Sequence, residues 1–312
     1  MKTITLILSL FLLTSCSNPD TSGGVALSRD VGDGHPGHWP FPHGSCSDQH
    51  DHSATNTGCG WVHHNEDSYY IMPNADLEGA NLSGAGPLSR GPNLSGARLP
   101  GANLKGSNLS YTSLKGVNLQ GADLRNAQLR NVELDHANLY FANLSGANLF
   151  GSGTNFANLS FANLSFANLG SASLGYTNLS YSDLDGANLE GSNLSYSDLS
   201  GASLSGANLT RTAWKNTVLQ GVALKNADLR GADLRNADLT GSYLFEVNLS
   251  GANLSGAVLV DTSFKDVNLR GANLSGANLN HDLLPGAVQA DSSTICPNGI
   301  HWGTAGNNCR IY

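Results

Sequence analysis

The sequence predicts an all-β fold in which the chain winds as a solenoid, and three observations support this prediction. First, every fifth residue from position 94 to position 284 is Leu, with Thr154, Trp214 and Phe264 as the exceptions. Second, the residue two positions before Leu is small, most often Ala, and an Asn or Asp usually lies between them. Third, the residue two positions after Leu is most often Gly, Asn or an aromatic residue.

A spacing of five residues fits neither a helix nor a flat strand. Five residues make about 1.4 turns of a helix, so the leucines would spread over all of its sides. In one continuous strand they would alternate between the two faces, because the period of a strand is two. Within one unit, Ala and Leu share a face, and the Gly or Asn that follows tolerates the left-handed backbone of a bend. We therefore predict short extended segments joined by bends, with Ala and Leu always facing inward.

The unit Ala-(Asn/Asp)-Leu-x-(Gly/Asn/Phe/Tyr) resembles the repeat of the pentapeptide repeat family, over about two thirds of the chain. This resemblance implies a right-handed quadrilateral parallel β-helix with about twenty residues per coil. From the outward-facing residues alone, coils of fifteen and of twenty residues fit equally well. Ten coils of twenty would form a rod about 50 Å long, at about 4.8 Å per stacked strand.

The pattern divides the chain into five segments. Residues 1–15 are expected to be a lipoprotein signal peptide, 16–34 a flexible tether, 35–75 a His-rich module pinned by a disulfide, 76–284 the β-helix and 285–312 a C-terminal cap. Gly86-Pro87 and Gly91-Pro92 each add one residue to the repeat, which predicts bulges in an irregular first coil. Trp302 and Ile311 are the expected contacts of the cap with the last coil.

The first sixteen residues have the features of an export sequence. Lys2 precedes the apolar run from Ile4 to Leu13, which is too short to span a bilayer. The sequence Leu13-Thr14-Ser15-Cys16 resembles a bacterial lipoprotein cleavage box, which implies that Cys16 is acylated and anchors the chain to a membrane. Ser17 resembles the sorting residue for the outer membrane, so we expect a lipid-anchored protein of the bacterial cell envelope. The alternative is an ordinary secretory sequence with a chance Cys.

The other four cysteines form two local pairs, one on each side of the repeats: Cys46 with Cys59, and Cys296 with Cys309. An exported protein keeps its disulfides. Each bridge closes a short loop and stabilises the fold by about 3 kcal/mol in the chain-entropy model. We therefore predict that disulfides pin both terminal segments.

A cluster of histidines before the repeats is the candidate metal site: His50, His52, His63 and His64. Neutral imidazoles suit zinc, copper or nickel. No spacing here matches a zinc finger or a His-Glu-x-x-His motif. The alternative is a solvated polar module that is held together by the Cys46–Cys59 bridge.

Aromatic residues recur at the bend position in the middle of the repeats. With twenty residues per coil they would stack along two neighbouring edges, as Phe141, Phe161 and Tyr181, and as Phe156, Tyr176 and Tyr196. Exposed aromatic ladders are typical of surfaces that bind a protein or a sugar. The alternative is that the rings only shield the coil beneath them.

These observations indicate a binding protein and exclude an enzyme. The inward positions are Ala and Leu, which leave no pocket, and the net charge is −8 with no basic stripe for nucleic acid. We expect a lipid-anchored envelope protein whose rigid rod presents a surface to an unknown envelope protein or glycan, with no resident cofactor. One alternative is a metal-binding envelope protein that acts through the His-rich module. Another follows from the resemblance to quinolone-resistance members, which imitate acidic DNA and protect gyrase.

Overall fold

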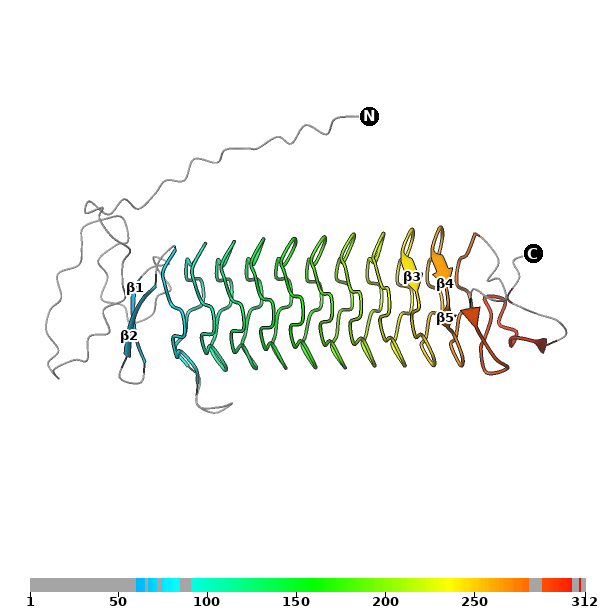
Figure 1. Ribbon diagram of the computed structural model, residues 1–312, viewed down its shortest axis with the longest axis horizontal. Helices are drawn as coiled ribbons and strands as arrows, with labels where there is room; N and C mark the ends of the chain where they lie inside the picture. The colour runs from blue at the N-terminus through cyan, green and yellow to red at the C-terminus, as the bar shows by residue number, and fades with distance from the viewer. Residues whose placement is uncertain are drawn as a thin grey trace, which may run out of the picture.

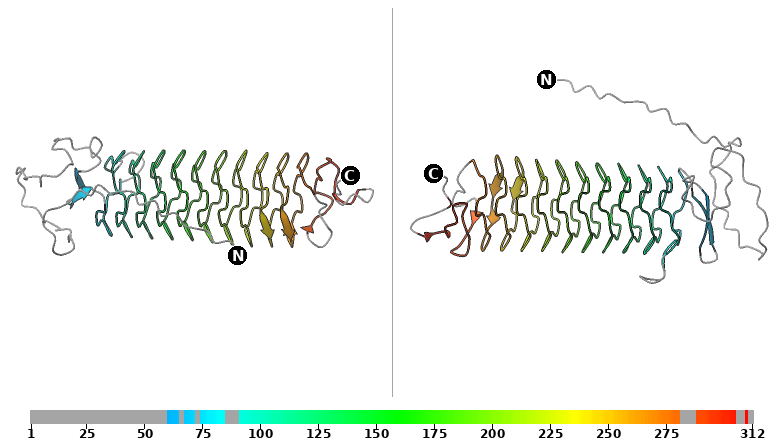
Figure 2. Two further views of the ribbon diagram at one scale, coloured as in Figure 1. Left: turned by 90° about the horizontal axis from the view of Figure 1, so that it is seen from above. Right: turned by 180° about the vertical axis from the view of Figure 1, so that it is seen from behind.

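The computed structural model describes residues 60–64, 67–71, 74–84, 91–280, 288–304 and 309. Successive coils stack along one axis and form a rod (Figure 1). The hairpin of β1 (Gly60–His64) and β2 (Asp67–Ile71) lies at one end of this rod and the C-terminal segment lies at the other. Two further views show the same arrangement (Figure 2).

Parallel β-bridges join each coil to the next, and the paired residues are twenty positions apart. Asn118 pairs with Asn138, Asn138 with Asn158, and Asn158 with Asn178. The bridges recur every five residues along the chain, so that each coil of twenty residues carries four of them. Of the two coil lengths that the sequence allows, twenty residues is therefore the one that this pairing uses.

Each repeat combines one bridge with one tight bend. The amide of Leu139 donates to the carbonyl of Asn158 in the next coil (2.7 Å), and the amide of Ala142 donates back to the carbonyl of Leu139 (2.9 Å). The side chain of Asn138 accepts a bond from the amide of Tyr140 (3.2 Å). The polar residue between Ala and Leu thus stabilises the bend, as Asn and Asp side chains commonly do in turns.

The inward positions form one continuous apolar core along the rod. The leucines of the repeat are buried, and the small residues two positions before them line the same interior. Thr154 and Trp214, which replace Leu in this column, are also fully buried, whereas Phe264 is partly buried against the core. The predicted inward direction of the Ala and Leu columns is confirmed.

Two short pairs of strands lie near the C-terminal end of the rod. Strand β3 (Tyr243–Phe245) pairs in parallel with β4 (Ser263–Lys265). Strand β5 (Val267–Asn268) pairs in parallel with β6 (Val288–Gln289).

An antiparallel hairpin precedes the first coil. It consists of β1 (Gly60–His64) and β2 (Asp67–Ile71), with Gly60 opposite Ile71. Ile71 is fully buried and belongs to the core of the rod, so the hairpin ends against the first coil.

The first coil contains one insertion and not the two single-residue bulges that the sequence suggested. Asp76 pairs with Asn103, and Asn81 with Asn108, at a separation of 27 residues instead of 20. Asn93 and Ser113 have already returned to the spacing of 20. Seven extra residues therefore lie between Asn81 and Asn93. Gly86 and Pro87 lie outside the described residues, and the amide of Gly91 already donates to the carbonyl of Tyr111, twenty residues further on (3.2 Å).

The parallel pairing continues into the segment that was expected to act as a cap. Strand β6 pairs with β5 at a separation of 21 residues, and Ile295 pairs with Asn273 at a separation of 22. Ile295 then forms an antiparallel bridge with His301, where the chain turns back. Trp302 is partly buried against the core, whereas Ile311 lies outside the described residues.

The predicted disulfide at this end is confirmed. Cys296 and Cys309 are bonded, with an S–S distance of 1.98 Å, and both side chains are buried in the core. The predicted bridge between Cys46 and Cys59 lies outside the described residues.

Candidate interaction surface

The aromatic residues of the bends form two stacks in the middle of the rod. The first ladder consists of Phe141, Phe161 and Tyr181, whose successive ring centroids are 5.1 and 5.0 Å apart. The second ladder contains Phe156, Tyr176 and Tyr196, whose successive centroids are both 4.9 Å apart and whose planes differ by 8° or less. The stacking predicted from the spacing of twenty residues is confirmed for all six rings.

The structure adds a histidine to the second ladder. The ring of His136 stacks on Phe156 at 5.1 Å with an interplanar angle of 6°. Tyr140 contacts the first ladder edge to face, at 4.4 Å from Phe141 and 5.8 Å from Phe161. Sequence reasoning missed both residues, although His136 stands at the bend position twenty residues before Phe156.

One side of the rod, here called the ladder face, lies between the two ladders. In each coil the chain leaves the second ladder, crosses four residues and reaches the first ladder or its continuation, as from Phe156 to Phe161. The outward residues of this face are polar apart from one tyrosine. They are Asn138, Tyr140, Asn158, Ser160, Asn178, Ser180, Asp198 and Ser200.

The rings are exposed in spite of their stacking. The exposed fraction of the six predicted residues ranges from 43% to 60%. Each of these residues also has a left-handed backbone, with φ between 57° and 63°. A residue with a Cβ is disfavoured there by about 1–2 kcal/mol, whereas Gly is not. Stacking returns about 0.5–1.5 kcal/mol per pair, so the rings bring little or no net stability to the bend.

The shielding alternative does not account for the rings. Leu159, which precedes the bend at Phe161, is completely buried. Leu204 and Leu219 precede bends at Gly206 and Gly221, where no ring lies within 4 Å of the Cβ position, and their exposed fractions are 0% and 1%. Because leucine is buried equally well beside glycine, the aromatic rings are not needed to cover the core.

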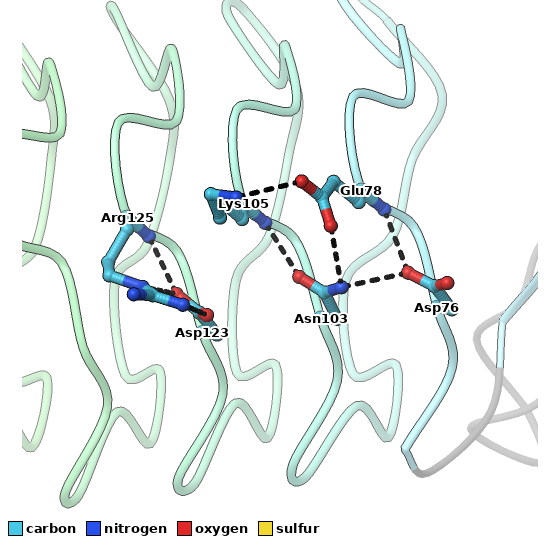
Figure 3. A network of polar contacts seen from close by, with 6 residues as sticks. All are labelled: Asp76, Glu78, Asn103, Lys105, Asp123 and Arg125. Carbon is cyan, nitrogen blue, oxygen red and sulfur yellow. Dashed lines mark hydrogen bonds and ion pairs between the residues drawn. The ribbon is translucent and has the colours of Figure 1, made fainter.

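Polar side chains stabilise other parts of the surface by pairing with one another (Figure 3). Lys105 forms an ion pair with Glu78 of the preceding coil at 3.0 Å, and the bond from Lys105 lowers the pKa of Glu78. Arg125 donates to the carboxylate of Asp123 and thereby lowers the pKa of that carboxyl. The same Asp-Leu-Arg arrangement recurs at Asp228 with Arg230 and at Asp233 with Arg235.

The remaining sequence-predicted sites lie wholly or partly outside the described residues. Cys16, Cys46, Cys59, His50 and His52 are not among them, and of His63 and His64 the structure describes only the backbone, in β1. In the described part of the chain, no three His, Cys, Asp or Glu side chains gather as a metal site would require. Nor does any helix in that part have the length and apolarity to cross a membrane. Metal binding and lipid anchoring stay predictions.

Comparison with known families decides what this rod is. The family model described as pentapeptide repeats matches with eight copies, over residues 90–126, 112–151, 157–195, 172–211, 202–244 and 242–280. These matches cover more than half of the chain. The chain belongs to the pentapeptide repeat family. Its fold is therefore a right-handed β-helix, and members of this family are typically structural or protein-interacting. No curated protein matches this pentapeptide repeat protein.

Several solved structures are similar to this pentapeptide repeat protein. HetL of the cyanobacterium Nostoc sp. strain PCC 7120, described as involved in heterocyst differentiation regulation, shares 29% identity over 74% of this chain and 93% of its own, with a TM-score of 0.40. QnrB1, a plasmid-mediated fluoroquinolone resistance protein, shares 16% identity over 62% of this chain and 87% of its own, with a TM-score of 0.33. A pentapeptide repeat protein of the Arabidopsis thaliana thylakoid lumen shares 25% identity over 44% of this chain and 69% of its own, with a TM-score of 0.14.

Proposed function

We propose that this protein is a non-enzymatic, lipid-anchored component of the bacterial cell envelope, in which the rod holds the ladder face toward a protein partner. The anchor is Cys16, and the outer membrane is the proposed location. The rod is proposed to be four-sided, because each coil carries four bridges, and the ladder face is one of its sides. No catalytic group or resident cofactor is part of this proposal, since the interior is filled by Ala and Leu.

One observation carries the proposal. Exposed aromatic rings occupy strained bends where glycine would bury the neighbouring leucine equally well, as Gly206 and Gly221 do. Residues that bring strain without stability are typical of functional surfaces. Large exposed apolar groups gathered on one side of a soluble rod are typical of interaction sites.

The stacking geometry favours a protein partner over a glycan. Sugars bind aromatic side chains through the face of the ring, but in each ladder the faces cover one another at about 5 Å. Rings inside a ladder, such as Phe161 and Tyr176, have a neighbour on both faces, which leaves their edges for a partner to contact. Ring edges pack well against apolar side chains, which are the usual partners of aromatic residues at protein interfaces.

Site-specific photo-crosslinking in intact cells tests this function. A photoreactive phenylalanine analogue replaces Phe161 or Tyr181 in the ladders, and Tyr243 in the control, because Tyr243 is 51% exposed and lies three coils after Tyr181 in the stacking order. We expect a discrete protein adduct from the ladder positions and none from Tyr243. Adducts of equal yield at all three positions, or at none, would contradict the proposed interaction face.

The anchor is tested separately. Replacing Cys16 by Ala removes the acylated atom, so we expect the protein to lose incorporation of labelled palmitate and to leave the membrane fraction. Replacing Ser17 by Ala is the control, since it leaves the thiol in place. Unchanged palmitate labelling in the Cys16 variant would show that the chain is not anchored as proposed.

A further inference from the structure

The coils that carry the ladders lack cationic residues. Residues 131–210 contain no Lys or Arg, although they make up four coils of the rod. They contain six carboxylates, which are Glu133, Asp135, Asp183, Asp185, Glu190 and Asp198. The middle of the rod, where the aromatic rings lie, is therefore acidic.

Two of these carboxylates are paired with cations of neighbouring coils. Glu133 lies 3.2 Å from Lys115, and Glu190 lies 3.8 Å from Arg211. The other four form no ion pair with a cation in the described part of the chain. Asp135 lies near the start of the ladders, whereas Asp183, Asp185 and Asp198 lie near their end.

The bonds that these three carboxylates accept come from neutral groups. Asp183 accepts from the amide of Asp185 at 3.0 Å. Asp185 accepts from the amide of Ser205 at 2.8 Å, and Asp198 accepts from the amide of Ser200 at 2.9 Å. All three side chains are only partly buried, so their negative charge faces solvent without compensation.

The three carboxylates lie on the two sides of the rod that meet at the first ladder. Asp183 and Asp185 follow Tyr181 directly along the chain. The ring of Tyr181 extends over Gly201, since a Cβ on that glycine would lie 2.6 Å from Tyr181 Cε1. Asp198 is three residues before Gly201, so it lies on the other side of the same ring. An exposed ring edge is thus flanked by negative charge on both sides.

We propose that the end of the first ladder binds a cationic segment of a protein partner, whose Lys or Arg side chains pair with Asp198 on the ladder face and with Asp183 and Asp185 on the adjoining side of the rod. The inference rests on the proposed function and names the chemistry of the partner. The aliphatic stems of Lys and Arg rest against the ring edge of Tyr181 while their charged ends reach the carboxylates. Charge complementarity of this kind sets the specificity and the association rate of a docking surface.

Two other occupants fit the charges less well. In a second copy of this chain, six of the twelve described Lys and Arg residues already pair with carboxylates, Arg230 and Arg235 among them. The other occupant is a DNA-binding protein, for which the acidic stretch would have to imitate duplex DNA. Duplex DNA carries about one negative charge per 1.7 Å of its axis, and the four coils span about 19 Å at 4.8 Å each. Duplex DNA would carry about eleven charges over that length, against six here, of which two are already paired.

The test measures binding of a fluorescent peptide of eight arginines to the full-length protein in detergent, at physiological salt. The ladder variant combines Asp183→Asn, Asp185→Asn and Asp198→Asn. Asn is the residue that neighbouring coils carry at two of these positions, as in Asn163 and Asn178, so the variant keeps the fold. The control variant changes the net charge equally at the distant bends Glu246, Asp261 and Asp266, as Glu246→Gln, Asp261→Asn and Asp266→Asn.

We expect the ladder variant to bind the arginine peptide about tenfold more weakly than the wild type, which corresponds to about 1.4 kcal/mol. The control variant should bind within about twofold of the wild type, and a peptide of eight glutamates should bind to neither. Equal weakening in the two variants would overturn the inference, since it would show general attraction to an acidic protein. Absence of binding to the wild type would overturn it as well.

Cross-linking from Phe161 in the ladder variant separates this inference from the proposed function. If the cellular adduct persists in the ladder variant, the rod still binds its partner and the cationic chemistry is wrong. If the adduct is absent from the wild type too, the proposed interaction face itself fails. Loss of the adduct in the ladder variant alone, together with the weaker peptide binding, supports the inference.

Discussion

The bends decide which residues can be replaced, because they hold a left-handed backbone at every fifth position. Glycine adopts this conformation without strain, and Asn and Asp tolerate it better than other residues. Where an aromatic residue of one coil is followed by glycine in the next, the ring lies over that glycine, as Phe166 lies over Gly186 and Tyr181 over Gly201. A bend glycine therefore has two separate roles, which are to relieve strain and to make room for a ring.

A pair of glycine substitutions separates these two roles. Gly201 and Gly206 have almost the same φ, 67° and 69°, but a Cβ on Gly206 would meet no atom within 4 Å, whereas one on Gly201 would overlap the ring of Tyr181. We expect Gly206→Ala to lower the free energy of unfolding by about 1–2 kcal/mol through backbone strain alone. Gly201→Ala should add the displacement of the Tyr181 ring, which NMR spectra of the tyrosine ring protons would report.

The outcome for the ring is the decisive one. Unchanged Tyr181 resonances in the Gly201 variant would contradict the placement of this ring over the glycine. A shift of the same size in the Gly206 variant would contradict it equally, since that substitution reaches no ring.

At this scale much of the structure follows from the sequence. The inward Ala and Leu columns depend only on the local alternation within each repeat, and the stacking of Phe156 on Tyr176 depends only on the coil length. The contact of Tyr140 with Phe161 does not follow, because it depends on how a side chain outside the bend column turns toward the next coil. The absence of ion pairs from Asp183, Asp185 and Asp198 also required the structure, since pairing depends on distances between coils.

The C-terminal segment shows what one element adds to the rod. It is joined to the preceding coil by β5 and β6, by the bridge of Ile295 with Asn273 and by a bond from Thr294 Oγ1 to the carbonyl of Leu269. The disulfide then ties Cys296 to Cys309 across a separation of 13 residues. In a solenoid each coil contacts only its neighbours, so the effect of this segment on stability is local.

Removing the disulfide should therefore loosen the last coils alone. We expect Cys296→Ser with Cys309→Ser to lower the local stability of the C-terminal end by about 3 kcal/mol, seen as faster hydrogen exchange of the amides of residues 267–280. Exchange in residues 136–200 should not change, because these coils are several neighbours away. Cys46→Ser with Cys59→Ser is the matched control and should leave residues 267–280 protected. Uniformly faster exchange along the rod would contradict this local role.

The ends of the rod were less predictable than its middle. The seven-residue insertion between Asn81 and Asn93 looks in the sequence like two short bulges, because Leu88 imitates the repeat. The parallel pairing that continues to Ile295 could not be predicted from the sequence, because β6 lacks the repeat motif. Its backbone nevertheless pairs with the preceding coil. In both places the frame is set by the neighbouring coil and not by local pattern.

On the scale of the whole molecule, the rod is a stack of interchangeable coils on which one stretch carries the surface chemistry. The core residues are nearly the same in every coil, so they give the rod its stiffness and length without marking any position. The two ladders and the carboxylates Asp183, Asp185 and Asp198 fall in the same four coils, residues 131–210. Stability and recognition are therefore separable along the axis, and a coil can be removed without altering the other coils.

Two deletions of equal length test this separation. Removing residues 217–236 takes out one complete coil of twenty residues beyond the ladders, and removing residues 142–161 takes out one coil that holds a ring of each ladder, Phe156 and Phe161. Both variants keep the repeat frame, so we expect both to fold into rods shorter by about 4.8 Å, with unchanged circular dichroism and a correspondingly smaller dimension by X-ray scattering. Cross-linking from Tyr181 should survive the first deletion and fall in the second. Equal cross-linking in the two variants would show that the ladders are dispensable, whereas loss in both would tie the interaction to the length of the rod.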